Sequence, residues 1–219
     1  MRTKTLAILS EKGGAGKTTT VIHIAVAALL MGQEVAVIDL DPQASAADWC
    51  DRRGGAPEAV TIPPARLEKL LSELRGNDVD LVIVDTPREA NNAAYTAAQC
   101  ADLVLIPLQP GGFDYRALTR TLDICRLAHK TPYVILNGMR PGAHRAEADA
   151  RETVAAMQCA VAPVVFHERA AYRTASITTK TAQETDPDGI AAAEIRALYM
   201  WVAQQLDLST TQQKVKETA

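Results

Sequence analysis

Lys12-Gly13-Gly14-Ala15-Gly16-Lys17-Thr18-Thr19 follows a short apolar run at residues 5–9 and opens an apolar segment at residues 17–31. A strand, a glycine-rich loop and a helix in that order are the context that a phosphate-binding loop requires. Glycines let the backbone turn tightly and direct its N–H groups at phosphate oxygens, and the helix N-terminus adds partial positive charge. We therefore expect residues 13–19 to bind nucleotide phosphates, with Lys17 at the β- and γ-phosphates and the Thr18 hydroxyl on Mg²⁺. An ordinary glycine turn entering a helix is the alternative.

The rest of the chain alternates short apolar runs with longer segments of helical character. We expect strands at residues 5–9, 34–38, 81–84, 103–106, 133–136 and 161–166. We expect helices at residues 17–31, 44–52, 64–74, 90–100, 113–128, 145–157 and 190–206. The strands are continuous apolar runs, which is typical of a parallel sheet covered on both faces. The alternation predicts an α/β fold with a doubly wound, mostly parallel sheet flanked by helices, as in P-loop NTPases.

The composition is that of one ordinary globular domain. Hydrophobic residues make up 47% and charged residues 22% of the 219 residues, so the chain can bury a sizeable core without disulfides or metals. We expect a single domain at residues 1–208 and a flexible polar tail at residues 209–219. The net charge of −3 argues against a protein that coats nucleic acid over its whole surface, but it permits a local basic patch.

The cysteines and the apolar segments favour a cytoplasmic protein. The four cysteines are far apart in the sequence, which favours reduced thiols over a metal site. The first strand begins so close to Met1 that no signal peptide is expected before it. Residues 22–31 form the longest strongly apolar stretch and are too short to span a bilayer, so we expect no membrane segment.

Acidic residues end two of the predicted strands. Asp39 and Asp41 follow the second strand, and alternation places both on the same side of an extended chain, where they can face the phosphates. Turn-forming aspartates before Pro42 are the alternative. Asp85 directly follows the apolar run at residues 81–84, in the position of a Walker B aspartate, and is expected to hold Mg²⁺ directly or through a water.

The phosphate loop departs from the general GxxxxGK[ST] pattern. Glu11 stands where that pattern has its first glycine, and Lys12 follows it, so the loop has the form KGGxGKT. This form resembles the deviant Walker A motif of the ParA/MinD superfamily of P-loop ATPases. The segment that ends the second strand, Asp39-Leu40-Asp41-Pro42-Gln43, is similar to the DxDPQ motif of ParA-type ATPases. The resemblance extends over residues 3–206 and is clearest in the first half.

The resemblance implies roles for three of these residues. Lys12 would cross a nucleotide-sandwich dimer and contact phosphate on the partner subunit, where its charge would offset the developing transition state as an arginine finger does. Asp41 would position or activate the attacking water, and Asp39 would support the Mg²⁺ shell. A lysine beside a phosphate loop is otherwise a solvated surface residue, which is the alternative for Lys12.

Three further positions near the predicted site are less specific. Arg88 has three open interpretations: a contact with phosphate, a pair with Glu89, or a position facing a partner. Asp114 is expected to cap the helix at residues 113–128. Asn137, at the end of a strand, is a candidate to hydrogen-bond the adenine, with a turn-forming role as the alternative.

Within the superfamily, the chain looks most like the short ParA group of partition and cargo-positioning ATPases, because no space is left for an N-terminal helix-turn-helix domain. Such proteins use ATP and Mg²⁺, form a homodimer with ATP, and bind DNA without sequence preference as nucleoid-associated dimers. They hydrolyse ATP when a ParB-like or other partner protein stimulates them. The polar tail lacks the basic amphipathic helix with which MinD proteins bind membranes. Arg169, Arg173 and Lys180 are candidate DNA contacts, with solvated surface residues as the alternative.

Two other interpretations stay open. One is a metabolic or metal-cluster-assembly enzyme on the same P-loop scaffold, which product formation from a small molecule would identify. The other is a nucleotide-dependent positioning switch that does not bind DNA. ATP-dependent retention on DNA separates the partition ATPase from both.

Overall fold

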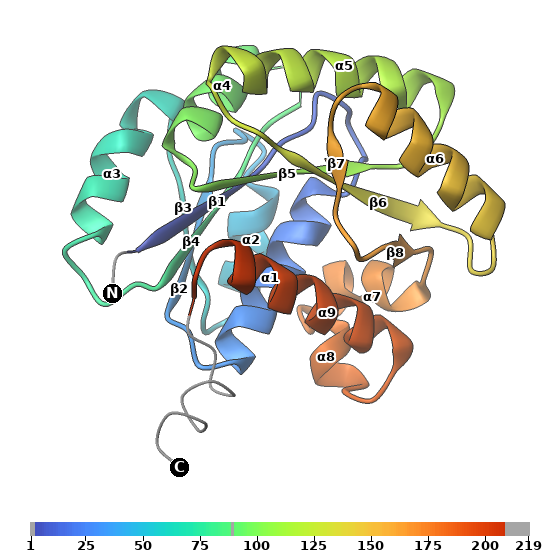
Figure 1. The fold of residues 1–219 in the computed structure, drawn as a ribbon. Coiled ribbons are helices and arrows are strands. Elements are labelled where there is room, and N and C mark those ends of the chain that lie inside the picture. Colours follow the sequence, from blue (N-terminus) through green and yellow to red (C-terminus); the bar gives the residue numbers. More distant parts are fainter. Residues whose placement is uncertain (1–2, 89, 209–219) are drawn as a thin grey trace.

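The computed structural model describes residues 3–88 and 90–208 (Figure 1). Its strands are β1 (Lys4–Ile8), β2 (Val35–Asp39), β3 (Glu58–Thr61), β4 (Leu81–Asp85), β5 (Leu103–Leu108), β6 (Tyr133–Met139), β7 (Ala160–Val161) and β8 (Phe166–His167). Its helices are α1 (Lys17–Leu30), α2 (Ser45–Arg53), the 3-10 helix η1 (Pro64–Arg66), α3 (Leu67–Leu74), α4 (Asn91–Cys100), α5 (Gly112–Leu127), α6 (His144–Ala156), α7 (Ala170–Thr178), α8 (Ala182–Thr185) and α9 (Ile190–Gln205). The tail at residues 209–219 lies outside the described residues, so its flexibility stays a prediction.

The strands form a parallel sheet in the order β3-β2-β4-β1-β5-β6-β7, with β8 paired to β6. β1 is central and pairs with β4 on one side and β5 on the other. The chain leaves β1 toward β2 and β3 on one side, and later continues through β5, β6 and β7 on the other. The predicted doubly wound parallel sheet is therefore confirmed. Ligands of such sheets bind at the carboxyl ends of the strands where the order reverses, which here means beside β1 and β4.

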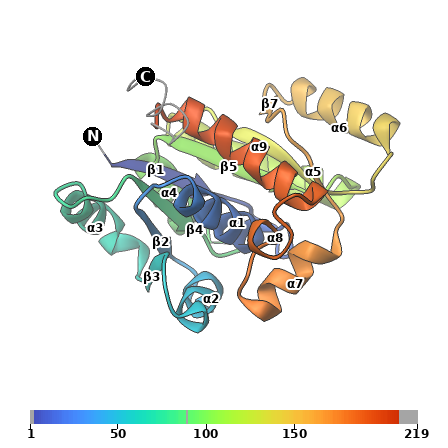
Figure 2. The same ribbon diagram turned by 90° about the horizontal axis from the view of Figure 1, so that it is seen from below.

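Helices cover both faces of this sheet (Figure 2). One hydrophobic core joins the sheet to α1, α2, α7, α8 and α9, and a second joins it to α3, α4, α5 and α6. Strand β1 shows how the sequence produces two cores. Leu6 and Ile8 belong to the first core and Ala7 to the second, because successive side chains of a strand point to opposite faces.

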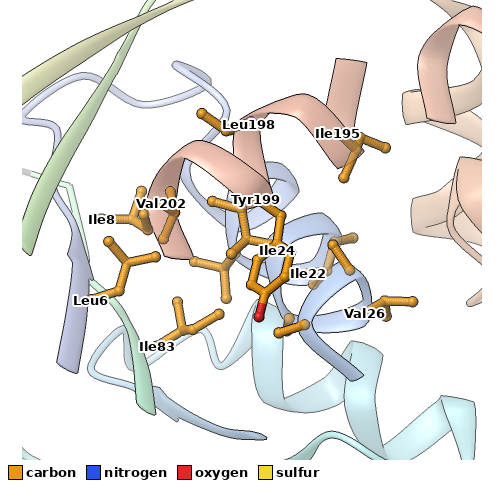
Figure 3. Close-up of a cluster of buried hydrophobic side chains, with 14 of the residues drawn as sticks. Leu6, Ile8, Ile22, Ile24, Val26, Ile83, Ile195, Leu198, Tyr199 and Val202 are labelled. Atoms are coloured by element: carbon orange, nitrogen blue, oxygen red, sulfur yellow. The ribbon is translucent and has the colours of Figure 1, made fainter. Parts of the chain in front are cut away.

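Helix α1 carries the glycine-rich loop at its N-terminus, and it packs against both the sheet and α9. In Figure 3, Tyr199 of α9 lies beside Ile24 of α1, with Leu6 of β1 on the sheet side. All three side chains have no exposed surface. Burying an aliphatic or aromatic side chain contributes about 1.5–3 kcal/mol, so this packing fixes the helix that presents the loop.

The structure differs from the sequence prediction at weakly patterned segments. Strand β3 was not predicted, because it is an edge strand that pairs only with β2 and whose side chains are mostly exposed. Helices α7 and α8 were not predicted either. The single strand predicted at residues 161–166 is wrong, since two short strands, β7 and β8, pair with different parts of β6. Pro163 lies between them and has no N–H to donate to a strand ladder.

His23 is a buried titratable residue on α1. Its Nδ1 lies 2.7 Å from the carbonyl oxygen of Thr19, and its ring meets Tyr172 edge-on with centroids 5.2 Å apart. Its Nε2 has no hydrogen-bond partner among the described residues. Burial lowers the pKa of His23 from 6.5 to about 4. Between these pH values, the unfolded chain binds a proton at this position that the folded chain does not bind.

We expect acidification from pH 7 to pH 4 to destabilise the fold by about 3 kcal/mol through His23, at about 1.4 kcal/mol per unit of pKa shift. Because the neutral imidazole is the buried form, stability is present above the unfolded pKa and is lost as the pH falls. Urea unfolding at a series of pH values measures this loss. In His23→Leu the same loss should be absent, and equal pH profiles for the two proteins would show that other groups are responsible.

Candidate nucleotide-binding site

A cavity of about 300 Å³ lies at the carboxyl ends of β1, β2 and β4. It is lined by Gly13, Gly14, Gly16, Lys17, Thr18 and Thr19 after β1, by Asp41 and Gln43 after β2, and by Thr86 and Arg88 after β4. These segments are far apart in the sequence, but β2, β4 and β1 are neighbours in the sheet. The cavity therefore occupies the position at which doubly wound sheets bind ligands.

A larger cavity of about 800 Å³ lies at the amino ends of β2 and β3. Its charged lining residues are all acidic: Glu34, Asp51, Glu58 and Asp78. Phosphate recognition requires cationic side chains and free N–H groups. Because the lining of the larger cavity is acidic, we assign the nucleotide to the smaller cavity, although its volume is less.

The glycines shape the loop at the smaller cavity. Gly14 and Gly16 have φ values of 76° and 97°, in the left-handed region that other residues disfavour. A Cβ atom on Gly16 would also lie 2.1 Å from Nδ2 of Asn137. The first turn of α1 has no acidic residue, and the N-cap residue Gly16 provides no side-chain cap. The N-terminus of α1 thus has the properties of an anion site.

Lys17 is held inside the loop. Its side chain is almost fully buried, and its Nζ donates to the carbonyl oxygens of Ser10 at 3.1 Å and Lys12 at 3.4 Å. Burial lowers the pKa of Lys17, and the nearby carboxylates, Asp85 first among them, oppose that shift. The ammonium group is therefore positioned by the backbone of the loop, in the lining of the cavity.

Thr18 and Asp85 form a hydroxyl–carboxylate pair beside the loop. Thr18 Oγ1 donates to Asp85 Oδ2 at 2.7 Å, while Asp85 Oδ1 is buried with no hydrogen-bond partner among the described residues. Burial raises the pKa of Asp85 to about 7. An unpartnered carboxylate oxygen next to a hydroxyl fits Mg²⁺, which prefers oxygen ligands and whose charge favours the ionised carboxylate.

Asp39 and Asp41 have different environments. Asp39 is fully buried, and its carboxylate accepts hydrogen bonds from the N–H groups of Asp41 and Ala46, each at 2.9 Å, and of Ala47 at 3.3 Å. Burial raises the pKa of Asp39 despite these bonds. Asp41 lines the cavity, and its Oδ1 accepts from the N–H of Gln43 at 2.9 Å. Of the two aspartates predicted to face the phosphates, only Asp41 lines the cavity.

Lys12 lies outside the lining of the cavity and pairs with Asp114 in the first turn of α5. The N-cap of α5 is Gly111, which provides no side-chain cap, so the prediction that Asp114 caps this helix is wrong. The Asp114 carboxylate is largely buried and is used to hold the lysine. Lys12 is therefore not a freely solvated surface residue in this structure.

Two amides support the loop, one on β6 and one directly after the end of β5. Asn137 Nδ2 donates to the carbonyl oxygen of Ala15 at 2.8 Å, so its amide contacts the loop backbone. Gln109 Nε2 donates to the carbonyl oxygen of Gly14 at 3.2 Å, a contact that the sequence did not predict. Arg88 lines the cavity, and its Cδ would lie 3.3 Å from a Cβ on Gly13. Glu89, the partner considered for Arg88, lies outside the described residues.

The three candidate DNA contacts lie in or near α7. Arg169 is mostly buried and donates from Nε to Glu194 Oε1 at 3.0 Å, so its charge is already paired. Arg173 is exposed, with Glu168 at 3.5 Å, and Lys180 is also exposed. Arg173 and Lys180, but not Arg169, thus present accessible positive charge.

A buried lysine in a glycine-rich loop at a helix N-terminus, with a hydroxyl–carboxylate pair beside it, defines a P-loop nucleotide-binding protein. Sequence comparison identifies the family of P-loop proteins to which the chain belongs. The profile of the CobQ/CobB/MinD/ParA nucleotide binding domain matches residues 6–178, and the chain belongs to this family. The predicted superfamily is thereby confirmed. Members of the family are ATPases that use Mg²⁺, which confirms the predicted enzyme class and the predicted ATP and Mg²⁺.

Two relatives and one solved structure show the extent of the similarity. The chain is 33% identical over 215 residues to the maintenance of carboxysome distribution protein A of Gloeobacter kilaueensis, covering 93% of this chain and 94% of that protein. It is 34% identical over 120 residues to protein ParA of Rhizobium radiobacter, covering 53% and 54%. A structure of Cyanothece McdA with ATP has a TM-score of 0.71 at 20% identity, covering 95% of this chain and 98% of the other, which shows a shared fold.

Members of this family dimerise with ATP and act with partner proteins. DNA as a ligand and a ParB-like partner stay predictions for this chain. Within residues 3–88 and 90–208, no helix is long and apolar enough to cross a membrane.

Proposed function

We propose that this chain is a partition or positioning ATPase that dimerises around ATP, binds DNA without sequence preference, and hydrolyses ATP when a ParB-like or other partner stimulates it. The observation that carries the proposal is the match, over nearly the whole chain, to a protein named for carboxysome distribution. The match to a protein named ParA supports the same class. The proposal implies a cytoplasmic protein that associates with the nucleoid when ATP is bound.

The cavity residues have separate tasks in the proposed reaction. The N–H groups of residues 13–19 bind the phosphates, and Lys17 offsets the charge of the β- and γ-phosphates. Thr18 and the unpartnered oxygen of Asp85 hold Mg²⁺, which supplies charge neutralisation at the phosphates when bound. Asp41 orients the attacking water from the end of β2.

Asp39 and Asn137 support these groups. Because Asp39 accepts the N–H of Asp41, it positions the water-orienting residue, and its predicted effect on the Mg²⁺ shell is indirect. Asn137 holds the loop through Ala15, and its Oδ1 is the atom that would accept from the adenine amino group. The contact of Asp39 with Asp41 and the contact of Asn137 with Ala15 are both hydrogen bonds in the structure.

Lys12 is proposed to act on the partner subunit. It lies outside the lining of its own cavity, and Asp114 neutralises it in the monomer. In an ATP dimer, phosphate of the partner subunit would replace Asp114 as the anion that Lys12 contacts, with the physical effect of an arginine finger.

Replacing Lys12 with alanine should leave ATP binding to the monomer nearly unchanged and weaken the ATP-dependent dimer by about tenfold or more, the range of a hydrogen bond to a charged group. Sedimentation or light scattering with AMPPNP measures the dimer, and phosphate release measures turnover. Lys69→Ala is the control, because Lys69 is an exposed lysine on α3. If neither the dimer nor turnover responds to Lys12→Ala, the cross-dimer role is wrong.

The DNA part of the proposal is tested by retention on arbitrary duplex DNA, with AMPPNP against ADP, over a salt series. We expect retention only with AMPPNP, falling steeply with salt. Changing Arg173 and Lys180 to alanine should reduce the salt slope by about one for each lost phosphate contact. Arg126→Ala, on the opposite face of the sheet, is the control. Equal, weak retention in both nucleotides while the AMPPNP dimer forms would favour the DNA-independent switch.

A further inference from the structure

Helix α2 is attached at its N-terminal end to the phosphate site. Asp39 Oδ2 accepts the N–H groups of Ala46 and Ala47, in the first turn of the helix. The cavity residue Asp41 leads into α2 through Ala44, whose φ of 52° lies in the left-handed region. A residue other than glycine adopts this conformation at a cost in free energy, so the surrounding contacts must hold the joint in place.

At its C-terminal end, α2 is attached to the last turn of α7, on the same face of the sheet (Figure 2). Three donors of α2 bind carbonyl oxygens there. Trp49 Nε1 donates to Ala175 at 2.7 Å, Arg52 to Ser176 at 3.3 Å, and Arg53 to Thr179 at 2.9 Å. The carbonyl groups at a helix C-terminus lack partners within the helix and carry partial negative charge. The guanidinium groups of α2 therefore bind the carbonyl oxygens of Ser176 and Thr179. The Trp49 indole is a second donor to the carbonyl oxygen of Ala175, which also accepts the N–H of Thr179 at 3.1 Å.

Arg53 also joins α2 to α8. Its guanidinium donates to both carboxylate oxygens of Glu184, at 2.9 and 2.6 Å, and both side chains are about one-fifth exposed. Its guanidinium carbon lies 5.5 Å from the centre of the Trp49 ring. A two-point arginine–carboxylate pair against an aromatic ring fixes the orientation of the guanidinium group as well as its distance from the carboxylate. Hydrogen bonds to other parts of the fold thus hold both ends of α2.

We propose that α2 couples the phosphate cavity to the α7 surface, with Trp49 and Arg53 as the positioning residues. A helix rises by about 1.5 Å per residue, and its hydrogen bonds keep it rigid along this length. A displacement of one end of the helix is therefore transmitted to the other end. A nucleotide that moves Asp41 changes the joint at Ala44, and α2 carries this change to the C-terminal turn of α7. That helix bears the exposed Arg173, and Lys180 follows it. The nucleotide state thereby controls the basic surface within one subunit, in addition to any effect of dimerisation.

The test is amide hydrogen exchange in α7, with AMPPNP against ADP, in the full chain. The variant combines Trp49→Phe, which removes only the indole donor, with Arg53→Lys, which keeps the charge but removes the two-point pair. In the wild type we expect exchange at residues 175–179 to differ between the two nucleotides. In the variant, the ratio of exchange rates between nucleotides should fall by about fivefold or more, within the usual range of coupling between sites, while AMPPNP affinity stays unchanged.

Glu147→Gln with Arg151→Lys is the matched control. These residues form a half-buried ion pair on α6, at the other face of the sheet, and should leave the exchange ratio at α7 unaltered. If the variant folds poorly, Glu184→Gln tests the same pair with a smaller change. A nucleotide-dependent difference that survives in a folded variant, or that is absent from the wild type, overturns the coupling.

The proposed coupling rests on the proposed function in one respect, which is that the basic surface at α7 binds DNA. Retention on duplex DNA is therefore measured for the same proteins. An exchange difference that depends on Trp49 and Arg53, without retention of any of the proteins, would support the coupling and contradict the DNA-binding function. Retention that depends on nucleotide in the wild type and no longer does so in the variant supports both.

Discussion

Replacing Lys17 with alanine is expected to lower the affinity for Mg-ATP by about a hundredfold or more. Lys17 is the buried cation of the cavity, and hydrogen bonds to charged groups are worth about 1.5–3 kcal/mol each. Asp85, Asp41 and Glu11 lie close enough to influence its charge. Without the ammonium group, these carboxylates would repel the phosphates. Calorimetric titration with Mg-ATP measures the loss.

The fold should survive this change. Burial lowers the pKa of Lys17, so the folded chain already bears a cost for holding its charge out of water. Alanine removes that cost together with the hydrogen bonds to Ser10 and Lys12, and we expect little change in the unfolding temperature. Lys180→Ala is the control for a lost lysine at an exposed position. A folded Lys17→Ala protein with wild-type affinity for ATP would contradict the assignment of the phosphate loop.

The centre of the fold and the loop were predictable because their sequence signals are local. β1, β2 and β4 are buried on both faces, and their continuous apolar runs stand out from the surrounding sequence. The glycine positions follow from backbone conformation alone, as the left-handed Gly14 and Gly16 show. Edge strand β3 was missed because its exposed side chains leave no apolar run.

The partners of the polar side chains were not predictable, because they lie far away in the sequence. Arg169 was a candidate DNA contact, but Glu194, on α9, pairs with it. Strand alternation predicts the same direction for Asp39 and Asp41. It does not show that N–H groups of α2 donate to the Asp39 carboxylate. The amide of Asn137 likewise serves the loop carbonyl of Ala15. In each case a residue type predicts that a polar contact exists, and only the fold determines with which group.

Replacing Asp41 with alanine is expected to slow partner-stimulated ATP hydrolysis by about a hundredfold or more while ATP binding persists, the usual range for loss of a positioned acid–base group. Asp41 lines the cavity, but it is neither the buried cation nor one of the two groups proposed to hold Mg²⁺. The phosphate-binding loop therefore remains complete. Phosphate release at saturating Mg-ATP measures the rate, and light scattering measures the ATP dimer, which should accumulate.

The two aspartates at the end of β2 have different expected roles: Asp41 acts in hydrolysis, and Asp39 also stabilises the fold. Asp39→Ala removes the acceptor of three N–H groups, and each one left unpaired costs about 1–3 kcal/mol, so this variant should lose stability as well as turnover. Asp41→Ala removes one bond to the N–H of Gln43 and should remain nearly as stable as the wild type. Asp48→Ala, which removes an exposed carboxylate from the first turn of α2, is the control for charge. Wild-type turnover in Asp41→Ala would show that this residue has no part in hydrolysis. Slow turnover with a persistent ATP dimer would support Asp41 as the residue that orients the attacking water.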